Sequence, residues 1–224
     1  MTSRVIAIVG AESTGKSTLA AALAARIGEQ TGLRCAVVSE FLREWCDREG
    51  RTPRADEQAA IAAEQQRRVA QAAASHELVV ADTMPLMVAV YSQLLFDDAA
   101  LLPMAIAAQR STALTLLTAL DLPWVADAHQ RDGEHVRVPV DSLLRTLLAA
   151  HGLGWSVVGG HGAARLEQAF DAACPLLQTL AAPGAGLFTR LARREAAMPA
   201  RRWVCDKCDL PDCEHAALRL LQRP

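Results

Sequence analysis

The chain has 224 residues and a formal net charge of −2 at neutral pH, and apolar residues make up 51% of it. This composition excludes an intrinsically disordered protein, because disordered chains combine low hydrophobicity with high net charge. The near balance of 23 basic and 25 acidic residues gives no support for a dedicated nucleic-acid-binding protein, which needs a basic excess to neutralise phosphates. No apolar run approaches the roughly 20 residues that span a bilayer, and the N-terminus lacks a signal-peptide pattern. We therefore expect a cytoplasmic protein with no membrane and no nucleic-acid partner.

In chain order, short apolar segments alternate with longer segments rich in helix-forming residues. The apolar segments are typical of buried parallel strands and lie at 5–9, 35–38, 78–81, 114–120 and 155–158. Helices are expected at 16 to about 30, 55–74, 85 to about 110 with a break near 97–98, 140–151 and 162–180. Residues 121–139 are expected to form a polar loop. This alternation predicts an α/β fold with a doubly wound, mainly parallel five-stranded sheet and helices on both faces.

The first predicted strand runs into the segment from Gly10 to Ser17, which fits the phosphate-binding pattern G-x-x-x-x-G-K-[ST] without exception. Its glycines allow the loop to wrap its N–H groups around phosphate oxygens at the positive end of the next helix. In such a loop Lys16 reaches the β- and γ-phosphates and the Ser17 hydroxyl binds Mg²⁺. The motif therefore predicts ATP and Mg²⁺ as cofactors and the three-layer fold of P-loop NTPases. The predicted nucleotide-binding residues are Gly10, Ala11, Glu12, Ser13, Thr14, Gly15, Lys16, Ser17 and Thr18.

Two acidic residues follow predicted strands, at the edge where ligands of a doubly wound sheet gather. Asp82 ends the third strand, where an acidic residue orients Mg²⁺ through water; the alternative is an ordinary turn residue. Glu40 follows the second strand, where a carboxylate accepts a hydroxyl proton from a phosphate acceptor or holds that acceptor by hydrogen bonds. The alternative for Glu40 is a solvated charge at the start of a helix.

The predicted loop at 121–139 carries Arg131 and Arg137. Arginines in a mobile loop suit phosphoryl transfer, because the loop closes over the nucleotide, excludes water and offsets developing charge. The alternative is that both are ordinary surface arginines. In the same loop, Trp124 either stacks on an aromatic ring of a ligand or packs the loop onto the core.

Three segments together resemble the NadR-type P-loop ATPase/kinase family, and in particular its ribosylnicotinamide kinase domain. They read GAESTGKSTL at 10–19, SEFLRE at 39–44 and LPWVAD at 122–127, and the resemblance covers about residues 4–180. It implies an ATP-dependent enzyme that phosphorylates a hydroxyl of a nucleoside-like small molecule. The family's ribosylnicotinamide kinases typically read Asp-Thr-Asp after the third strand, whereas this chain reads Asp-Thr-Met at 82–84. The loss of one hydrogen-bonding carboxylate shifts substrate preference, so the acceptor is less constrained than ATP.

The family's functional residues match positions of this chain one by one. The matching positions are Lys16, Ser17, Glu40, Arg43, Asp82, Trp124, Asp127 and Arg131. The resemblance implies that Ser17 and Asp82 bind Mg²⁺. It implies catalytic roles for Lys16, Glu40, Asp82 and Arg131, the last as a lid arginine. Contact with substrate is implied for Glu40, Arg43, Trp124 and Asp127, although Trp124 and Asp127 match positions that contact either substrate or nucleotide.

The C-terminal tail is expected to form a separate part of the chain. Pro183 and the glycines at 184–186 mark a boundary, which gives a P-loop domain at 1–182 and a tail at 183–224. The tail carries the pattern C-x-x-C-x4-C-x-H, and three thiolates with one imidazole complete a tetrahedral zinc site. The predicted structural zinc ligands are Cys205, Cys208, Cys213 and His215. The alternatives are a redox-active C-x-x-C pair and free thiols, and the family resemblance does not extend to this tail.

Two functional interpretations remain at this point. The first is an ATP-dependent kinase for a small-molecule acceptor with a nucleoside-like hydroxyl. The second is a nucleotide-dependent switch or accessory ATPase whose zinc tail binds a partner. A protein partner or a homo-oligomer is compatible with either interpretation.

Overall fold

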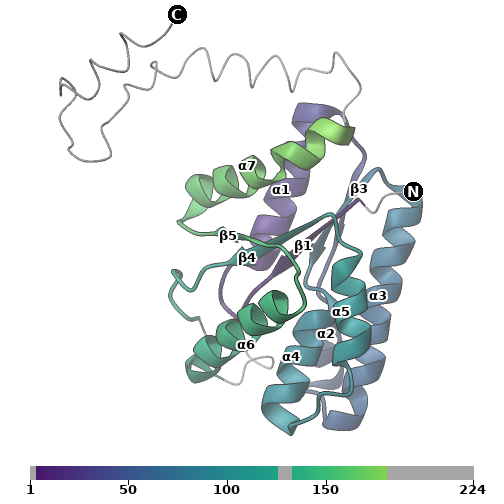
Figure 1. Cartoon of the computed structure of the whole chain (residues 1–224), viewed down its shortest axis with the longest axis vertical. Helices are drawn as coiled ribbons and strands as arrows, with labels where there is room; N and C mark the ends of the chain where they lie inside the picture. The colour runs from purple at the N-terminus through teal and green to yellow at the C-terminus, as the bar shows by residue number, and fades with distance from the viewer. Residues whose placement is uncertain (1–3, 126–132, 181–224) are drawn as a thin grey trace, which may run out of the picture. The chain divides into compact units, whose positions relative to one another are not determined.

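The computed structural model describes residues 4–125 and 133–180, all of which belong to one unit, Met1–Ala181. Five parallel strands form its sheet in the order β2-β3-β1-β4-β5 (Figure 1). The strands are β1 (Val5–Val9), β2 (Cys35–Val38), β3 (Leu78–Asp82), β4 (Leu114–Thr118) and β5 (Ser156–Val158). The predicted α/β fold with a doubly wound parallel sheet is therefore confirmed.

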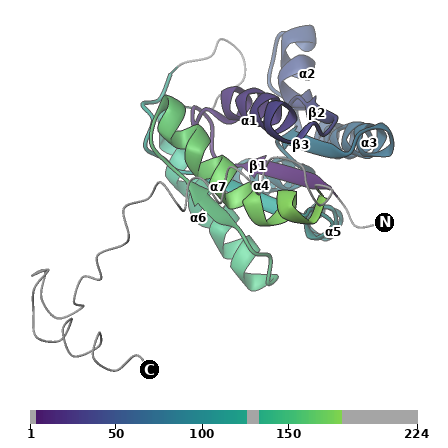
Figure 2. The ribbon, with the colours of Figure 1, turned by 90° about the horizontal axis from the view of Figure 1, so that it is seen from above.

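Helices cover both faces of the sheet, and this explains why its inner strands are apolar throughout. These helices include α1 (Lys16–Thr31), α3 (Gln58–Ser75), α4 (Pro85–Phe96), α5 (Leu102–Arg110), α6 (Arg137–Ala150) and α7 (Gly162–Leu180). Alternate residues of β1, namely Val5, Ala7 and Val9, pack in one core cluster with α4, α5 and α6. The residues between them face the opposite side, where α1 and α7 lie next to each other (Figures 1 and 2).

The structure differs from the prediction around α2 (Phe41–Glu49), which was not expected as a helix. This helix has two turns, and its buried side chains are Trp45 and Cys46. The helix expected at 55–74 is a short 3-10 turn, η1 (Ala55–Glu57), followed by α3. The apolar residues Phe41, Leu42, Trp45 and Cys46 recur at a helical spacing, but the segment is shorter than the roughly 11–18 residues over which such a pattern is read, so the sequence analysis did not identify α2.

The expected loop at 121–139 is shorter than predicted. A 3-10 turn, η2 (Glu134–Val136), leads directly into α6, which begins at Arg137 rather than at residue 140. Pro139 therefore lies in the first turn of a helix, where its missing N–H has no helical partner to lose. Within 4–125 and 133–180, no helix has the length and apolar character needed to cross a membrane.

Candidate nucleotide and acceptor site

The loop between β1 and α1 has the backbone that the phosphate-binding motif predicts. Gly10 has a φ of +145° and Gly15 a φ of +76°, and both values lie in the region that favours glycine. A Cβ on Gly10 would collide with the hydroxyl of Thr118 at the end of β4. Gly15 is also the N-cap of α1, so the N-terminus of this helix opens onto the loop. The loop therefore presents backbone donors and the positive end of a helix dipole at one place.

A small cavity of about 160 Å³ lies in this loop, and we call it the phosphate cradle. It is lined by the consecutive residues 13–18 and by Arg43 of α2. The Lys16 ammonium group lies across the loop and donates a hydrogen bond to the Ala11 carbonyl at 2.9 Å. Ser17 is exposed at the start of α1, where its hydroxyl is accessible. The arrangement is that of a site for a chain of phosphates.

A larger cavity of about 450 Å³ adjoins the cradle, and we call it the acceptor cavity. Ser13, Lys16 and Arg43 line both cavities, so the two spaces meet at these three side chains. The other lining residues come from β1 and its loop, α2, the segment before α3, and α4: Gly10, Glu12, Glu40, Leu42, Cys46, Thr52, Pro53, Arg54, Gln58, Thr83, Met87, Tyr91, Leu95 and Phe96. The wall from α4 is largely apolar, and the walls from α2 and residues 52–58 carry most of the polar groups.

Glu40 lies at the junction of these elements as the N-cap of α2. Its side chain is only 18% exposed, and one carboxylate oxygen lies 3.7 Å from the Arg43 guanidinium. Burial raises the pKa of Glu40 above its ordinary value; the charges of Lys16 and Arg43 act in the opposite direction, and Asp82 adds to the rise. The structure thus brings Glu40, Arg43 and Lys16 together at one cavity.

Asp82 is the last residue of β3, and Thr83 follows it and lines the acceptor cavity. Asp82 is 3% exposed, and within the described part of the chain its Oδ1 has no hydrogen-bond partner. Thr83 has a φ of +79°, and its hydroxyl likewise has no partner among the described residues. A buried oxygen without a partner is costly in a folded protein unless a ligand or water completes it. The position therefore fits a group that binds Mg²⁺ through water, and the chemistry of a carboxylate and a hydroxyl suits that ion.

Met84 does not take the place of a polar residue in the acceptor cavity. Its side chain is 2% exposed and packs in the hydrophobic core beneath α4, and it does not line the cavity. The apolar residue at this position therefore contributes to the core, and the acceptor cavity draws its polarity from α2 and residues 52–58 instead.

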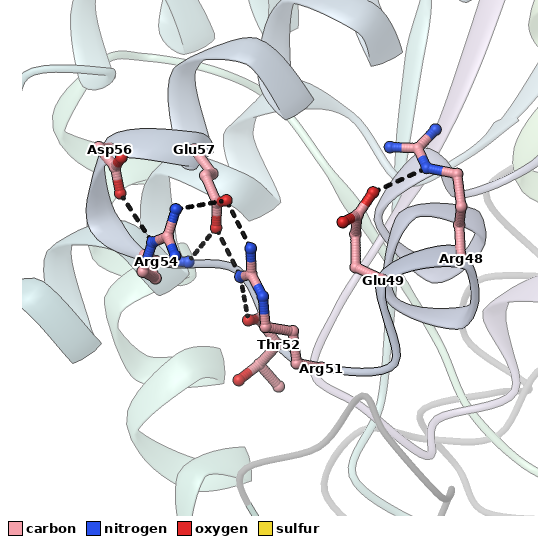
Figure 3. A network of polar contacts seen from close by, with 7 residues as sticks. All are labelled: Arg48, Glu49, Arg51, Thr52, Arg54, Asp56 and Glu57. Atoms are coloured by element: carbon pink, nitrogen blue, oxygen red, sulfur yellow. Dashed lines mark hydrogen bonds and ion pairs between the residues drawn. The ribbon is translucent and has the colours of Figure 1, made fainter.

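The segment before α3 holds one wall of the acceptor cavity through a charge network (Figure 3). Both oxygens of Glu57 accept hydrogen bonds from Arg51 at 2.7 Å, and Glu57 also accepts from the backbone N–H of Arg54 at 2.8 Å. These bonds lower the pKa of Glu57 to about 2. The Arg51 guanidinium also lies 4.9 Å from the ring centre of Trp45. Because Thr52 and Arg54 line the cavity, the network fixes part of its wall.

Sequence reasoning did not identify this wall. The spacing of Arg54 and Glu57 carried the signal, because a glutamate three residues after the residue that precedes a helix accepts a hydrogen bond from the N–H of that residue.

The sequence analysis also missed Thr118, which lies fully buried at the end of β4. The Thr118 hydroxyl is 2.7 Å from that of Thr14, and this contact connects the phosphate loop to the sheet. A single threonine at a strand end carries no pattern that would reveal such a role.

The segment after β4 packs against the phosphate loop. The Ser13 hydroxyl donates to the Val125 carbonyl at 3.0 Å and accepts from the Val125 N–H at 3.1 Å. The Trp124 indole nitrogen lies 3.5 Å from a Glu12 carboxylate oxygen. Trp124 therefore packs the segment onto the phosphate loop in this structure, and it does not line either cavity.

The prediction for Arg137 was wrong. Arg137 is the first residue of α6, is 6% exposed and donates a hydrogen bond to the Leu122 carbonyl at 2.8 Å, so it anchors the segment after β4 instead of belonging to a mobile loop. Asp127 and Arg131 lie outside the described residues. The four predicted zinc ligands Cys205, Cys208, Cys213 and His215 also lie outside them, and the described ranges contain no group of three metal-binding side chains.

Comparisons with known proteins agree with the fold. The family described as AAA domain matches residues 5–165. No curated protein matches the chain. Among solved structures, a NadR protein in complex with NR superposes with a TM-score of 0.63 at 21% sequence identity, over 81% of this chain and 52% of that chain. A NadR protein in complex with NAD and AMP-PNP gives a TM-score of 0.59 at 21% identity, over 77% of this chain and 49% of that chain.

A thymidylate kinase from Ehrlichia chaffeensis shares the fold as well, with a TM-score of 0.52 at 13% identity, over 80% of this chain and all of that one. The expected resemblance to NadR-type P-loop proteins is confirmed at the level of the fold. The chain spans about half the length of the NadR proteins it matches.

Proposed function

Since the chain belongs to the AAA domain family, we propose that it is an ATP-dependent phosphotransferase that moves the γ-phosphoryl group of ATP to a hydroxyl of a small, nucleoside-like molecule. The observation that carries the proposal is the junction of the two cavities. Ser13, Lys16 and Arg43 line both the phosphate cradle and the acceptor cavity, so a phosphate in one lies next to an acceptor in the other. Proximity of this kind is the main requirement of phosphoryl transfer, which needs little covalent chemistry from the protein.

The residues at the junction supply the remaining steps. The acceptor hydroxyl attacks the γ-phosphorus while Glu40 accepts its proton, and the bond to the bridging oxygen of ADP breaks. Lys16 and Arg43 face the equatorial and leaving oxygens, where they stabilise negative charge as it develops. The raised pKa of Glu40 makes it a stronger base than an ordinary glutamate.

Ser17 and Asp82 would hold Mg²⁺, Ser17 through its hydroxyl and Asp82 through water. The exposed hydroxyl at the start of α1 and the buried carboxylate oxygen without a partner among the described residues support this assignment. When bound, the ion neutralises charge on the β- and γ-phosphates. The residues themselves orient the phosphates toward the acceptor cavity.

The mixed lining of the acceptor cavity supports a nucleoside-like acceptor. The α4 wall offers Met87, Tyr91 and Phe96 to a planar apolar group, and the opposite wall offers Glu40 and Arg54 to hydroxyl groups. One NadR structure that shares the fold is a complex with NR, which supports this class.

A substrate screen tests the proposal. Purified protein is incubated with Mg-ATP and a panel of nucleosides and related metabolites, and the products are read by mass spectrometry. We expect one acceptor class to gain a phosphoryl group with ATP consumed in equal amount. Slow ATP hydrolysis that no panel member accelerates would contradict the kinase and favour the alternative, a nucleotide-dependent switch or accessory ATPase that responds to a protein partner.

A further inference from the structure

Arg165 occupies a position that local physics disfavours. It lies in the first turn of α7, where the helix dipole repels a cation, and it is only 4% exposed, so its charge is also largely removed from water. Buried charges persist in proteins when hydrogen bonds and opposite charges compensate them. The compensation for Arg165 comes from three separate segments.

Each of the three nitrogens of the guanidinium has an acceptor. Nη1 donates to the Thr14 carbonyl of the phosphate loop at 2.7 Å, and Nε donates to the Gly160 carbonyl after β5 at 2.8 Å. Nη2 pairs with the carboxylate of Asp121, which follows β4. The other oxygen of Asp121 accepts the N–H of Gly160 at 2.5 Å. One side chain thus joins the phosphate loop to the turns after β4 and β5.

The bond to Thr14 fixes the direction of a donor in the phosphate cradle. The Thr14 carbonyl and the Gly15 N–H belong to the same peptide group, and in a trans peptide they point in opposite directions. Gly15 lines the cradle, whereas Arg165 lines neither cavity. Because the Arg165 guanidinium holds the Thr14 carbonyl from outside the cradle, the Gly15 N–H points the other way, toward the cradle. The positive charge also polarises the peptide, which strengthens that N–H as a donor to an anion.

We propose that Arg165 is a positioning residue for the nucleotide phosphates, acting through the Thr14–Gly15 peptide, and that Asp121 holds its guanidinium in place. This inference rests on the proposed nucleotide site. In this proposal α7 and the turn after β5 take part in phosphate binding, although neither contributes a side chain to the cradle.

The test compares Arg165→Lys and Asp121→Asn with the unaltered chain. Lysine keeps the charge, but its single ammonium cannot bond three acceptors in the geometry of the planar guanidinium. Arg26→Gln is the matched control. Arg26 lies on α1, pairs at 2.6 Å with Glu167 of α7, the helix that carries Arg165, and packs over Phe170 of α7. The measurements are the affinity for Mg-ADP by calorimetry, the melting temperature, and the shift of the Gly15 amide resonance on adding Mg-ADP.

We expect Arg165→Lys to lower the affinity for Mg-ADP by at least about 10-fold and to reduce the Gly15 shift, because a charge-assisted bond to the loop is lost. Asp121→Asn should change both quantities in the same direction, and it provides the answer if Arg165→Lys does not fold. Arg26→Gln should lower only the melting temperature. Unchanged affinity and an unchanged Gly15 shift in folded variants would overturn the role of Arg165 alone. Failure of the unaltered chain to bind Mg-ADP would overturn the proposed function and this role together.

Discussion

At the scale of single side chains, the proposed chemistry rests on three charged residues. Lys16 and Arg43 bring positive charge to the junction of the cradle and the acceptor cavity, and Glu40 is subject to these two cations and to the buried carboxylate of Asp82. Burial outweighs the attraction of the two cations, so the pKa of Glu40 is raised. In the proposed mechanism, the ionised form of Glu40 accepts the acceptor proton next to Arg43, and the raised pKa makes that form a stronger base than an ordinary glutamate.

Lys16→Ala should abolish productive use of ATP while the domain stays folded. Lys16 is half-buried and acts as a point charge directed at phosphates, so its loss removes transition-state stabilisation without opening the core. We expect kcat to fall by about 10²–10³-fold, the range for the loss of one such group. Arg145→Ala is a control, because Arg145 pairs with Asp141 on α6 and lines neither cavity. Normal turnover in the lysine variant would reject the nucleotide site.

Glu40→Gln should suppress transfer far more than nucleotide binding. A glutamine keeps the shape and the hydrogen-bonding oxygen but cannot accept a proton, and general-base assistance is worth about 10²–10⁴-fold. The measurements are kcat with a saturating acceptor and the affinity for Mg-ADP. Equal losses in both quantities would show that Glu40 is a structural residue.

The raised pKa of Glu40 also predicts an effect on stability. The folded protein holds the Glu40 proton to a higher pH than the unfolded chain does, so ionisation of this group destabilises the fold as the pH rises through the folded-state pKa. Glu40→Gln removes that penalty. The variant should therefore be more stable than the unaltered chain at neutral pH, and the difference should vanish below the ordinary glutamate pKa of about 4.3. Urea unfolding at several pH values provides the measurement, and a constant difference would contradict the shift.

At the scale of elements, the two walls of the acceptor cavity differ in how they are held. The α4 wall belongs to the core, where Met87 and Leu86 are buried against the sheet. The wall at 51–57 depends on hydrogen bonds between charged side chains (Figure 3). The charge network is therefore the part of the cavity that a single polar substitution can alter.

Glu57→Gln should weaken acceptor binding and leave nucleotide binding unchanged. The substitution loses the charge that holds Arg51 and Arg54, and Arg54 lines the acceptor cavity but not the cradle. We expect the KM for the acceptor to rise roughly 2- to 5-fold, as suits an exposed charge pair. Glu49→Gln is the matched control, because Glu49 pairs with Arg48 nearby and lines neither cavity. An equal rise in the KM for ATP would contradict the separation of the two cavities.

The sequence predicted elements and site residues that have a local signature. The strands are continuous apolar runs, and the phosphate loop has fixed spacing, so both were identified with nearly correct bounds. Glu40 and Asp82 were predicted as site residues because they lie at the ends of strands. Thr118, Asp121 and Arg165 were missed, since their roles depend on contacts between segments up to 151 residues apart, such as Arg165 with Thr14. Arg137 was misplaced because its helix begins before a proline.

At the scale of the whole molecule, the tail should bind one zinc ion per chain through Cys205, Cys208, Cys213 and His215. Short loops between thiolates make the closure of such a site inexpensive in entropy. No residue of this set belongs to the phosphate loop or the strand ends, so chelation should leave Mg-ADP binding intact. Elemental analysis of protein purified without added metal is the measurement, with Cys174→Ser as a control outside the set. A zinc content near zero, with the three thiols freely titratable, would contradict the site.

The central claim is that the cradle and the acceptor cavity operate as one reaction space. Its most direct test follows the γ-phosphoryl group of labelled Mg-ATP in the presence of the acceptor found by the substrate screen. We predict that the label appears on the acceptor in equal amount to the ADP formed, and that Glu40→Gln slows this transfer by about 10²–10⁴-fold. Label found only in inorganic phosphate, at a rate that the acceptor does not change, would contradict the account.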